Sequence, residues 1–273
     1  MGKILVTGGT GLVGAHLLLQ LTYLGKNPIA IKRENSDIEN VKKVFAYYSE
    51  NFENLFNQIK WIKCDILDIC QLDKVIESVS CIYHVAALVS FNSALKNQMI
   101  ENNTTGTSNV VDCALKHNIK KICHVSSIAT LGSNEQNNID ENCIWDWTNK
   151  SSYAISKYLA EMEVWRGIQE GVPSVIVNPG VILGPGFFDS GSGGLFKRVH
   201  KGLRYATQGV AGYVGVVDVI KSMVILMNSD CKNERYIIVA ENLSSLDFTT
   251  LISNAFKLAP PKKIAPKWML SFA

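Results

Sequence analysis

The sequence predicts an α/β fold in which a doubly wound parallel sheet carries a smaller C-terminal lobe, and three observations predict it. Short, almost wholly apolar runs alternate with helical segments up to residue 178, which is the pattern of parallel strands covered on both faces. A glycine-rich turn directly follows the first apolar run. The alternation stops after Pro179, where six glycines lie between residues 180 and 194, and such a loop-rich segment is typical of a substrate-binding region.

The elements follow from the apolar runs and from the residues that end them. The first helix should stop at Gly25, with Pro28 just beyond it, because helices commonly end at a glycine. We expect strands at residues 3–7, 29–31, 61–64, 81–85, 122–126, 174–178, 213–216 and 236–240. We expect helices at residues 12–24, 72–79, 153–169, 195–202, 217–227 and 245–258, a long one ending near residue 117, and a broken one over 37–59.

Composition and charge exclude several classes of protein. The 273 residues are 47% hydrophobic and 19% charged, so the chain can bury a core and is not disordered. A net charge of +3 argues against nucleic-acid binding, which normally requires a basic stripe. No apolar run reaches the roughly 18 residues of a membrane helix, and we expect no signal peptide and no membrane partner. Seven cysteines without a CxxC pair, and five histidines without metal-ligand spacing, predict a cytoplasmic protein with reduced thiols and no metal.

The turn after the first strand has the pattern of a phosphate-binding loop. Gly8 permits a tight turn, Gly11 lets the backbone approach a pyrophosphate, and Gly14 allows close packing of the helix. The N-terminus of that helix offers free N–H groups and the positive end of its dipole to the phosphates. We therefore predict a Rossmann-type dinucleotide-binding domain over residues 1–178, with a contribution from 213–230; the alternative is a glycine turn without a ligand. The expected cofactor contacts here are Gly8, Thr10, Gly11, Leu12 and Val13.

The end of the second strand bears on the choice of cofactor. Lys32, Arg33 and Glu34 follow one another there. An acidic residue at this point would bind the ribose 2′-OH of NAD, whereas an arginine would accept the 2′-phosphate of NADP. Glu34 has the expected spacing from the glycine loop, but Lys32 and Arg33 come first and can form charge-assisted hydrogen bonds with phosphate. We therefore predict NADP in preference to NAD; in the alternative, all three are solvated surface charges.

Two segments supply candidate catalytic residues. Tyr153 and Lys157 are four residues apart, which puts them on one face of the predicted helix. A lysine cation near the hydroxyl should lower the pKa of the tyrosine toward the range useful for proton transfer. Ser126 and Ser127 end the fifth strand, at the edge of a parallel sheet where ligands bind. Ser127 is our candidate to orient a substrate oxygen toward Tyr153, and Ser126 is the competing one.

The order of these motifs resembles that of one known family. TGGTGLVG at residues 7–14, HVAA at 84–87, NTTGTSN at 103–109, the serines at 126–127 and YAISK at 153–157 occur in the order of the extended short-chain dehydrogenase/reductase family, within its NAD-dependent epimerase/dehydratase group. The resemblance covers about residues 1–228. It is closer to the dihydroflavonol-reductase-like branch, because Asn178 stands where many sugar-nucleotide enzymes have an arginine.

The resemblance implies further residues around the cofactor, at its adenine, along its length and at its nicotinamide. They are Asp65 and Ile66 at the adenine; Ala86, Ala87 and Asn103 along the cofactor; and Asn178, Pro179 and Val181 beside the nicotinamide. Ser126, Tyr153 and Lys157 would also bind the cofactor. A homodimer through the helix that carries YAISK is a further implication of the resemblance.

The expected function is an NAD(P)-dependent oxidoreductase with a small-molecule substrate, in which a hydride passes between nicotinamide and a carbonyl or alcohol carbon. Tyr153 would move the hydroxyl proton, Lys157 would lower its pKa and bind the nicotinamide ribose, and Ser127 would orient the oxygen. One alternative is a non-catalytic dinucleotide-binding regulator. The other is a sugar-nucleotide epimerase or dehydratase, whose diphosphate would be held by Lys197, Arg198, Lys201 and Arg204. Residues 179–273 would form a substrate-binding lobe that is truncated at its C-terminus.

Overall fold

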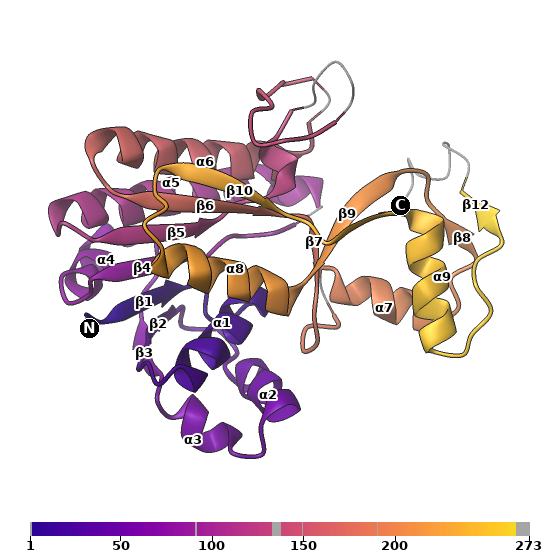
Figure 1. Ribbon diagram of the computed structural model, residues 1–273, viewed down its shortest axis with the longest axis horizontal. Coiled ribbons are helices and arrows are strands. Elements are labelled where there is room, and N and C mark those ends of the chain that lie inside the picture. Colours follow the sequence, from indigo (N-terminus) through magenta and orange to yellow (C-terminus); the bar gives the residue numbers. More distant parts are fainter. Residues whose placement is uncertain (1, 91, 133–137, 149, 190, 266–273) are drawn as a thin grey trace.

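A parallel sheet of seven strands forms the centre of the larger part of the molecule (Figure 1). The computed structural model describes residues 2–90, 92–132, 138–148, 150–189 and 191–265. In spatial order the strands are β10 (Glu234–Ile238), β6 (Ser174–Pro179), β5 (Lys121–Val125), β4 (Cys81–His84), β1 (Ile4–Thr7), β2 (Ile29–Lys32) and β3 (Lys60–Lys63), and all neighbours pair in parallel. Because the strand order reverses between β1 and β4, their carboxyl ends border a crevice, which is the usual ligand site of such sheets.

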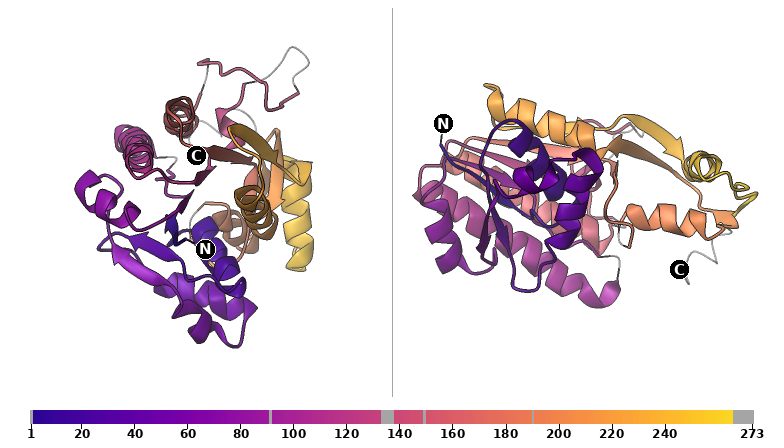
Figure 2. Two further views of the ribbon diagram at one scale, coloured as in Figure 1. Left: turned by 60° about the vertical axis from the view of Figure 1, so that its left-hand side comes forward. Right: turned by 90° about the horizontal axis from the view of Figure 1, so that it is seen from below.

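Helices cover both faces of this sheet (Figures 1 and 2). One face is covered by α1 (Leu12–Tyr23), α2 (Glu39–Tyr48), α3 (Phe52–Phe56) and α8 (Val216–Asn228), and the other by α4 (Ile69–Ile76), α5 (Lys96–Lys116) and α6 (Ser152–Glu170). Successive strand residues point to opposite faces, so Val6 shares a buried cluster with Leu17 of α1, whereas Leu5 shares one with Val110 of α5. The predicted fold class is confirmed.

The smaller lobe lies beyond the carboxyl ends of the strands (Figure 1). Its centre is a three-stranded sheet of β11 (Glu241–Ser244), β9 (Val210–Gly215) and β7 (Val181–Leu183). The helices α7 (Gly193–His200) and α9 (Ser245–Ala255) pack here through Val199, Tyr213, Phe248 and Ile252. A second pair of strands, β8 (Tyr205–Ala206) and β12 (Lys263–Ile264), completes the described part of the lobe.

The expected strands and long helices are present with ends that differ by a few residues, and the segment 37–59 is broken into α2 and α3. Four strands of only two to four residues, β7, β8, β11 and β12, were not predicted; strands this short depend on their pairing partners rather than on local sequence. Residues 234–238, expected within the lobe, instead extend the main sheet as β10. The prediction of a truncated end concerns residues 267–273, which lie outside the described residues.

Candidate active site

A cavity of about 1580 Å³ opens along the carboxyl ends of the main strands, between the sheet and α7. It is lined by the glycine loop, the segments that follow β2 to β6, and residues of the lobe. Pockets for a single small ligand have volumes of roughly 300–1,000 Å³. The cavity therefore has room for a cofactor and a substrate together.

The glycine loop is shaped by close backbone contacts. Gly8 has a φ of +70°, and a Cβ added to it would lie 2.6 Å from the backbone nitrogen of Ala86. A Cβ on Gly14 would lie only 2.1 Å from the carbonyl oxygen of Gly8. Gly11 is the N-cap of α1 and supplies no side-chain hydrogen bond, and the first turn contains no acidic residue. The backbone N–H groups at this helix end are thus left for an external acceptor, which fits a bound phosphate.

A buried histidine supports the strand end that packs against this loop. His84 Nδ1 lies 2.8 Å from Thr7 Oγ1, which also accepts a hydrogen bond from the backbone N–H of Ala86 (3.2 Å). His84 Nε2 lies 2.9 Å from Thr107 Oγ1, whose own proton goes to a backbone carbonyl one turn earlier in α5. These bonds assign the ring proton to Nε2 and describe a neutral imidazole. Burial, aided by the nearby Lys157, lowers the pKa of His84 to about 3, so this residue supports the cavity wall and is not a base.

The far end of the cavity, beside β2, is positively charged. Lys32, Arg33 and Ser36 line it, and the backbone N–H of Arg33 donates to Ser36 Oγ (3.1 Å). Glu34, by contrast, forms an ion pair with Lys63 and is not part of the lining. The cations at this position therefore face the cavity, while the acid is held by a lysine of the neighbouring strand.

The candidate catalytic residues meet at the other end of the cavity. The side chains of Ser127 and Tyr153 are hydrogen-bonded to each other. Lys157 is buried, and its Nζ donates to the backbone carbonyl of Val125 (2.8 Å). Burial lowers the pKa of Lys157 to about 8, against the opposing effect of Glu161. Such a lysine is still largely protonated at neutral pH.

The expected lowering of the tyrosine pKa is not found. Burial raises the pKa of Tyr153, and only the hydrogen bond with Ser127 acts in the opposite direction. The desolvation of a buried phenolate outweighs the neighbouring protein groups. A positive charge on a bound ligand would lower this pKa.

The cavity gathers all but two of the predicted cofactor-binding and catalytic residues. Asn103 and Asn178 lie behind the lining: Asn103 Nδ2 donates to the carbonyl of Leu88 (2.9 Å) and to Ser156 Oγ (3.1 Å), whereas Asn178 Nδ2 donates to the carbonyl of Ser127 (3.1 Å). Asn178 is fully buried and supports the turn at Ser127 from behind. The predicted residues in the lining are Gly8, Thr10, Gly11, Leu12, Val13, Lys32, Arg33, Asp65, Ile66, Ala86, Ala87, Ser126, Ser127, Tyr153, Lys157, Pro179 and Val181.

The lobe adds further cations to the lining. Lys197, Arg198 and Lys201 of α7 and its C-terminal end face the cavity, and Lys197 forms an ion pair with Asp189. Arg204, predicted with them as a diphosphate ligand, lies beyond the end of α7 and outside the lining. Ser36 was not predicted, although its position three residues after Arg33 was a usable signal. Within the described residues, no cluster of three or more histidine, cysteine or acidic side chains could hold a metal ion, and no helix is long and apolar enough to span a membrane.

A glycine loop at the first strand, a crevice at the reversal of strand order and a Ser–Tyr–Lys set define a Rossmann-type protein that binds a dinucleotide. Comparisons with known proteins agree. The sequence pattern of the NAD dependent epimerase/dehydratase family matches residues 4–238. The chain therefore belongs to this family of NAD-dependent enzymes, and the resemblance stated above is confirmed.

Individual relatives span several activities. A Synechocystis protein that carries the name of a dihydroflavonol 4-reductase is 29% identical, over 98% of this chain and 77% of its own. Cinnamoyl-CoA reductase 1 of Petunia hybrida is 24% identical, over 94% and 78%. A UDP-N-acetyl-alpha-D-glucosaminuronate decarboxylase of Bacillus cytotoxicus is 29% identical, over 76% and 62%.

Among solved structures, that of gox2253 has a TM-score of 0.86 at 26% identity and covers all of this chain and 81% of that one. DesIV, a dTDP-glucose 4,6-dehydratase of Streptomyces venezuelae solved with NAD and TYD bound, has a TM-score of 0.82 at 19% identity, covering 97% and 85%. At that identity, the likeness to DesIV concerns the fold alone.

Proposed function

We propose that the protein is an NAD(P)-dependent oxidoreductase that transfers a hydride between nicotinamide and a carbonyl or alcohol substrate. The observation that carries the proposal is the hydrogen-bonded pair of Ser127 and Tyr153, with Lys157 buried beside it, at one end of a dinucleotide-sized cavity. A protein that only bound the cofactor would not need a buried proton donor there. The named reductases among the relatives point the same way.

In this proposal each residue has one task. The cofactor supplies or accepts the hydride. Tyr153 donates the proton to the carbonyl oxygen during reduction and removes it during oxidation. Ser127 donates a hydrogen bond to the same oxygen and holds it toward Tyr153. Lys157, protonated and fixed by the carbonyl of Val125, binds the nicotinamide ribose.

We further propose NADP as the preferred cofactor. Lys32, Arg33 and Ser36 supply two cations and a hydroxyl at the end of the cavity nearest β2, a set suited to a 2′-phosphate. Glu34, the residue that would bind a free 2′-hydroxyl, is engaged by Lys63. NAD is the alternative cofactor if this ion pair opens.

A sugar-nucleotide epimerase or dehydratase is the second candidate, and one observation favours it. Lys197, Arg198 and Lys201 border the substrate end of the cavity, where they could hold a diphosphate. Such an enzyme would return the hydride to its substrate within one turnover and consume no cofactor.

Cofactor consumption separates these functions. Purified protein is mixed with NADPH or NADH and a panel of aldehydes, ketones and sugar nucleotides, and the absorbance of the reduced cofactor is followed. Carbonyl-dependent oxidation of NADPH is expected. Conversion of a sugar nucleotide without net change in cofactor would refute the reductase, and cofactor binding without any turnover would indicate a regulator.

A pair of variants in α6 tests the proposed proton donor. Tyr153→Phe should lower kcat by about 10²-fold or more while cofactor binding is retained. Tyr158→Phe is the matched control, because Tyr158 lies in the same helix but stacks on Trp145 outside the cavity. Full activity of Tyr153→Phe would refute the mechanism.

A homodimer through α6 and a cytoplasmic location stay predictions. Sedimentation of the purified protein tests the first, with a monomer as the contradicting result. Fractionation of the source cells tests the second.

A further inference from the structure

A fully buried carboxylate lies directly behind the catalytic residues. Glu161, one helical turn beyond Lys157 in α6, has no exposed surface. Its Oε2 accepts hydrogen bonds from Ser126 Oγ (2.5 Å), Thr130 Oγ1 (2.8 Å) and Asn178 Nδ2 (2.9 Å). Its Oε1 accepts from Trp165 Nε1 (3.1 Å) and Arg235 Nη1 (3.2 Å). Five donors therefore surround one carboxylate. A buried charge requires such hydrogen bonds to offset the cost of its removal from water.

Three of these donors fix the turn that carries Ser127. Ser126 precedes it, and Thr130 ends the short 3₁₀-helix η2 (Ile128–Thr130) that follows it. Thr130 Oγ1 and Asn178 Nδ2 both lie within hydrogen-bond distance of the carbonyl of Ser127, at 2.8 Å and 3.1 Å. The backbone on both sides of Ser127 is thus tied to the carboxylate of Glu161.

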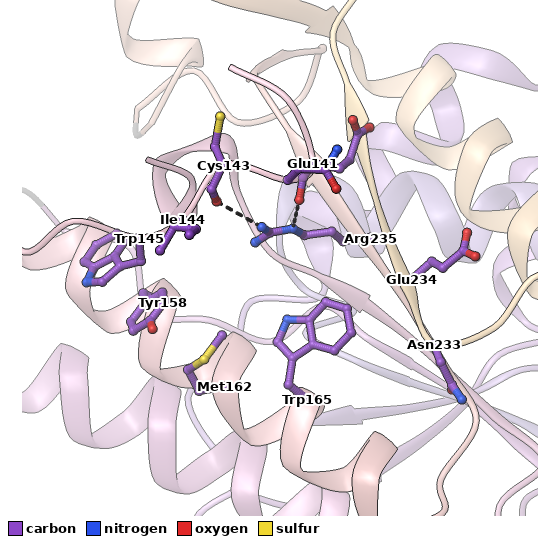
Figure 3. A pocket seen from close by; sticks show the side chains of 11 residues that line it. Glu141, Cys143, Ile144, Trp145, Tyr158, Met162, Trp165, Asn233, Glu234 and Arg235 are labelled. Carbon is purple, nitrogen blue, oxygen red and sulfur yellow. Dashed lines mark hydrogen bonds between the residues drawn. The ribbon is translucent and has the colours of Figure 1, made fainter. Parts of the chain in front are cut away.

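The remaining side of the carboxylate is tied to a distant loop. Arg235, in the edge strand β10, donates from Nε to the carbonyl of Glu141 (2.8 Å) and from Nη2 to the carbonyl of Cys143 (3.1 Å), as Figure 3 shows. The same loop contributes Ile139 to the lining of the reaction cavity. One guanidinium therefore connects a wall of the cavity to the carboxylate behind Ser127.

We propose that Glu161 and Arg235 are positioning residues for the reaction at Tyr153: Glu161 sets the place of Ser127, and Arg235 locks the loop at 139–143 to the same carboxylate. The proposal rests on the function proposed above. Neither residue lines the reaction cavity, so both act through others.

The effect on Lys157 follows from the charges that face it. The ammonium donates to the carbonyl of Val125 from β5 and interacts with the imidazoles of His84 and His124 from β4 and β5. Burial lowers the pKa of Lys157, and Glu161 is the group that opposes this. Without the carboxylate, Lys157 should therefore lose its proton at a lower pH.

Glu161→Gln is the first test. It removes the charge and points an amide NH₂ at neighbours that are themselves donors. We expect kcat for carbonyl reduction to fall by about tenfold or more, since misplacement of an ångström can cost about 10²-fold, with KM for the cofactor within about twofold. The alkaline limb of the pH–rate profile should move to lower pH. A residue that only stabilised the fold would not move this limb.

Arg235→Met is the second test, with Arg166→Met as the matched control. Arg166, a partly exposed residue of α6, forms ion pairs with Asp112, Glu163 and Glu170, none of which involves Ser127. Arg235→Met should lower kcat by about tenfold without the downward shift of the alkaline limb, and Arg235→Lys should restore part of it. Arg166→Met should leave the kinetics unchanged.

Amide hydrogen exchange gives a readout that does not depend on activity. Residues 126–131 should exchange faster in Glu161→Gln, and both 126–131 and 138–146 in Arg235→Met, while Arg166→Met changes neither. If the wild type reduces no carbonyl, the proposed function fails and exchange alone decides the positioning. If Glu161→Gln does not fold, Thr130→Val and Arg235→Lys carry the test, with a smaller fall in kcat. Wild-type kinetics, an unmoved alkaline limb and unchanged exchange would overturn the proposal.

Discussion

The two ends of the cavity are built on different principles. At the glycine loop, backbone lies against backbone: the contacts of Gly14 with Gly8 and of Gly8 with Ala86 leave no space for a Cβ. At the lobe, the lining comes from side chains of α7 and its preceding loop, and Lys197 and Asp189 keep 49% and 85% of their side-chain surface exposed. The first end can hold one invariant group such as a pyrophosphate, whereas the second can change its side chains without changing its backbone. Substrate choice should therefore reside in the lobe.

Two matched glycine substitutions should show the largest difference in cofactor affinity between the two ends of the cavity. Gly14→Val places side-chain atoms where the carbonyl of Gly8 lies, and overpacking of this kind costs about 2 kcal/mol or more, or roughly thirtyfold in cofactor affinity. Gly194→Val, in α7, meets nothing within 4 Å and should leave that affinity unchanged. Titration of intrinsic fluorescence with NADPH measures both. Equal losses in the two variants would contradict the contrast.

The second largest difference is expected in how the free energy of unfolding depends on pH, between the main sheet and the lobe. Burial, followed by the nearby Lys157 and His84, lowers the pKa of His124 well below its usual value, and neither ring nitrogen has a partner among the described residues. A pKa that is depressed by folding contributes stability above the unfolded value of about 6.5, which is lost as the pH falls, at about 1.4 kcal/mol per pH unit.

The free energy of unfolding of the wild type should therefore fall by about 2 kcal/mol between pH 6.5 and pH 5. In His124→Leu this fall should be absent. His200→Gln, an exposed position in the lobe, is the control and should leave the slope unchanged. Urea unfolding at several pH values provides the measurement. A slope in His124→Leu that equals the wild-type slope would show that His124 takes up no proton on unfolding in this range.

The charge beside β2 should have a smaller and more specific effect. If Arg33 binds a 2′-phosphate, Arg33→Ala removes a charge-assisted hydrogen bond of about 1.5 kcal/mol and raises KM for NADPH by about tenfold. KM for NADH should change little, since that cofactor lacks the phosphate. A parallel rise in both constants would assign Arg33 to general packing instead of phosphate recognition.

The smallest effect is expected at the lobe. Lys201→Ala removes one exposed cation from the lining, and a single exposed charge contributes about 0.2–1 kcal/mol. KM for an anionic substrate should rise about two- to fivefold, with the constants for both cofactors unchanged. A change for neutral substrates of the same size would argue against an electrostatic role.

The extent to which sequence predicts this site differs between its parts for a physical reason. Tyr153 and Lys157 could be paired because a spacing of four fixes their common helix face. Glu161 lies one more turn along the same face, but its partners Thr130 and Arg235 are 31 and 74 residues away. Only the folded sheet brings those donors together, so a local pattern cannot show that the carboxylate is buried and satisfied.

Side-chain direction was the other limit. Asn178 lies in β6, where successive residues face opposite sides of the sheet, and the resemblance put it beside the nicotinamide. Its amide instead points to the turn at Ser127, while Pro179 and Val181 line the cavity. The fold class, in contrast, followed from apolar runs alone, because strands buried on both faces admit few other residues.

The path of the chain between the main sheet and the lobe has a mechanical consequence. The chain crosses three times, from β6 to β7, from β9 to α8, and from β10 to β11. The crossings are hydrogen-bonded to each other, from Gly180 N to the carbonyl of Ile238 (3.1 Å) and from Ala240 N to that of Tyr213 (2.9 Å). Because the three connections are hydrogen-bonded to each other, they resist twisting and sliding relative to one another. They can still bend together, along a line that crosses all three. The lobe should therefore swing about a single hinge line, and we expect such a swing to change the width of the cavity between α7 and the glycine loop.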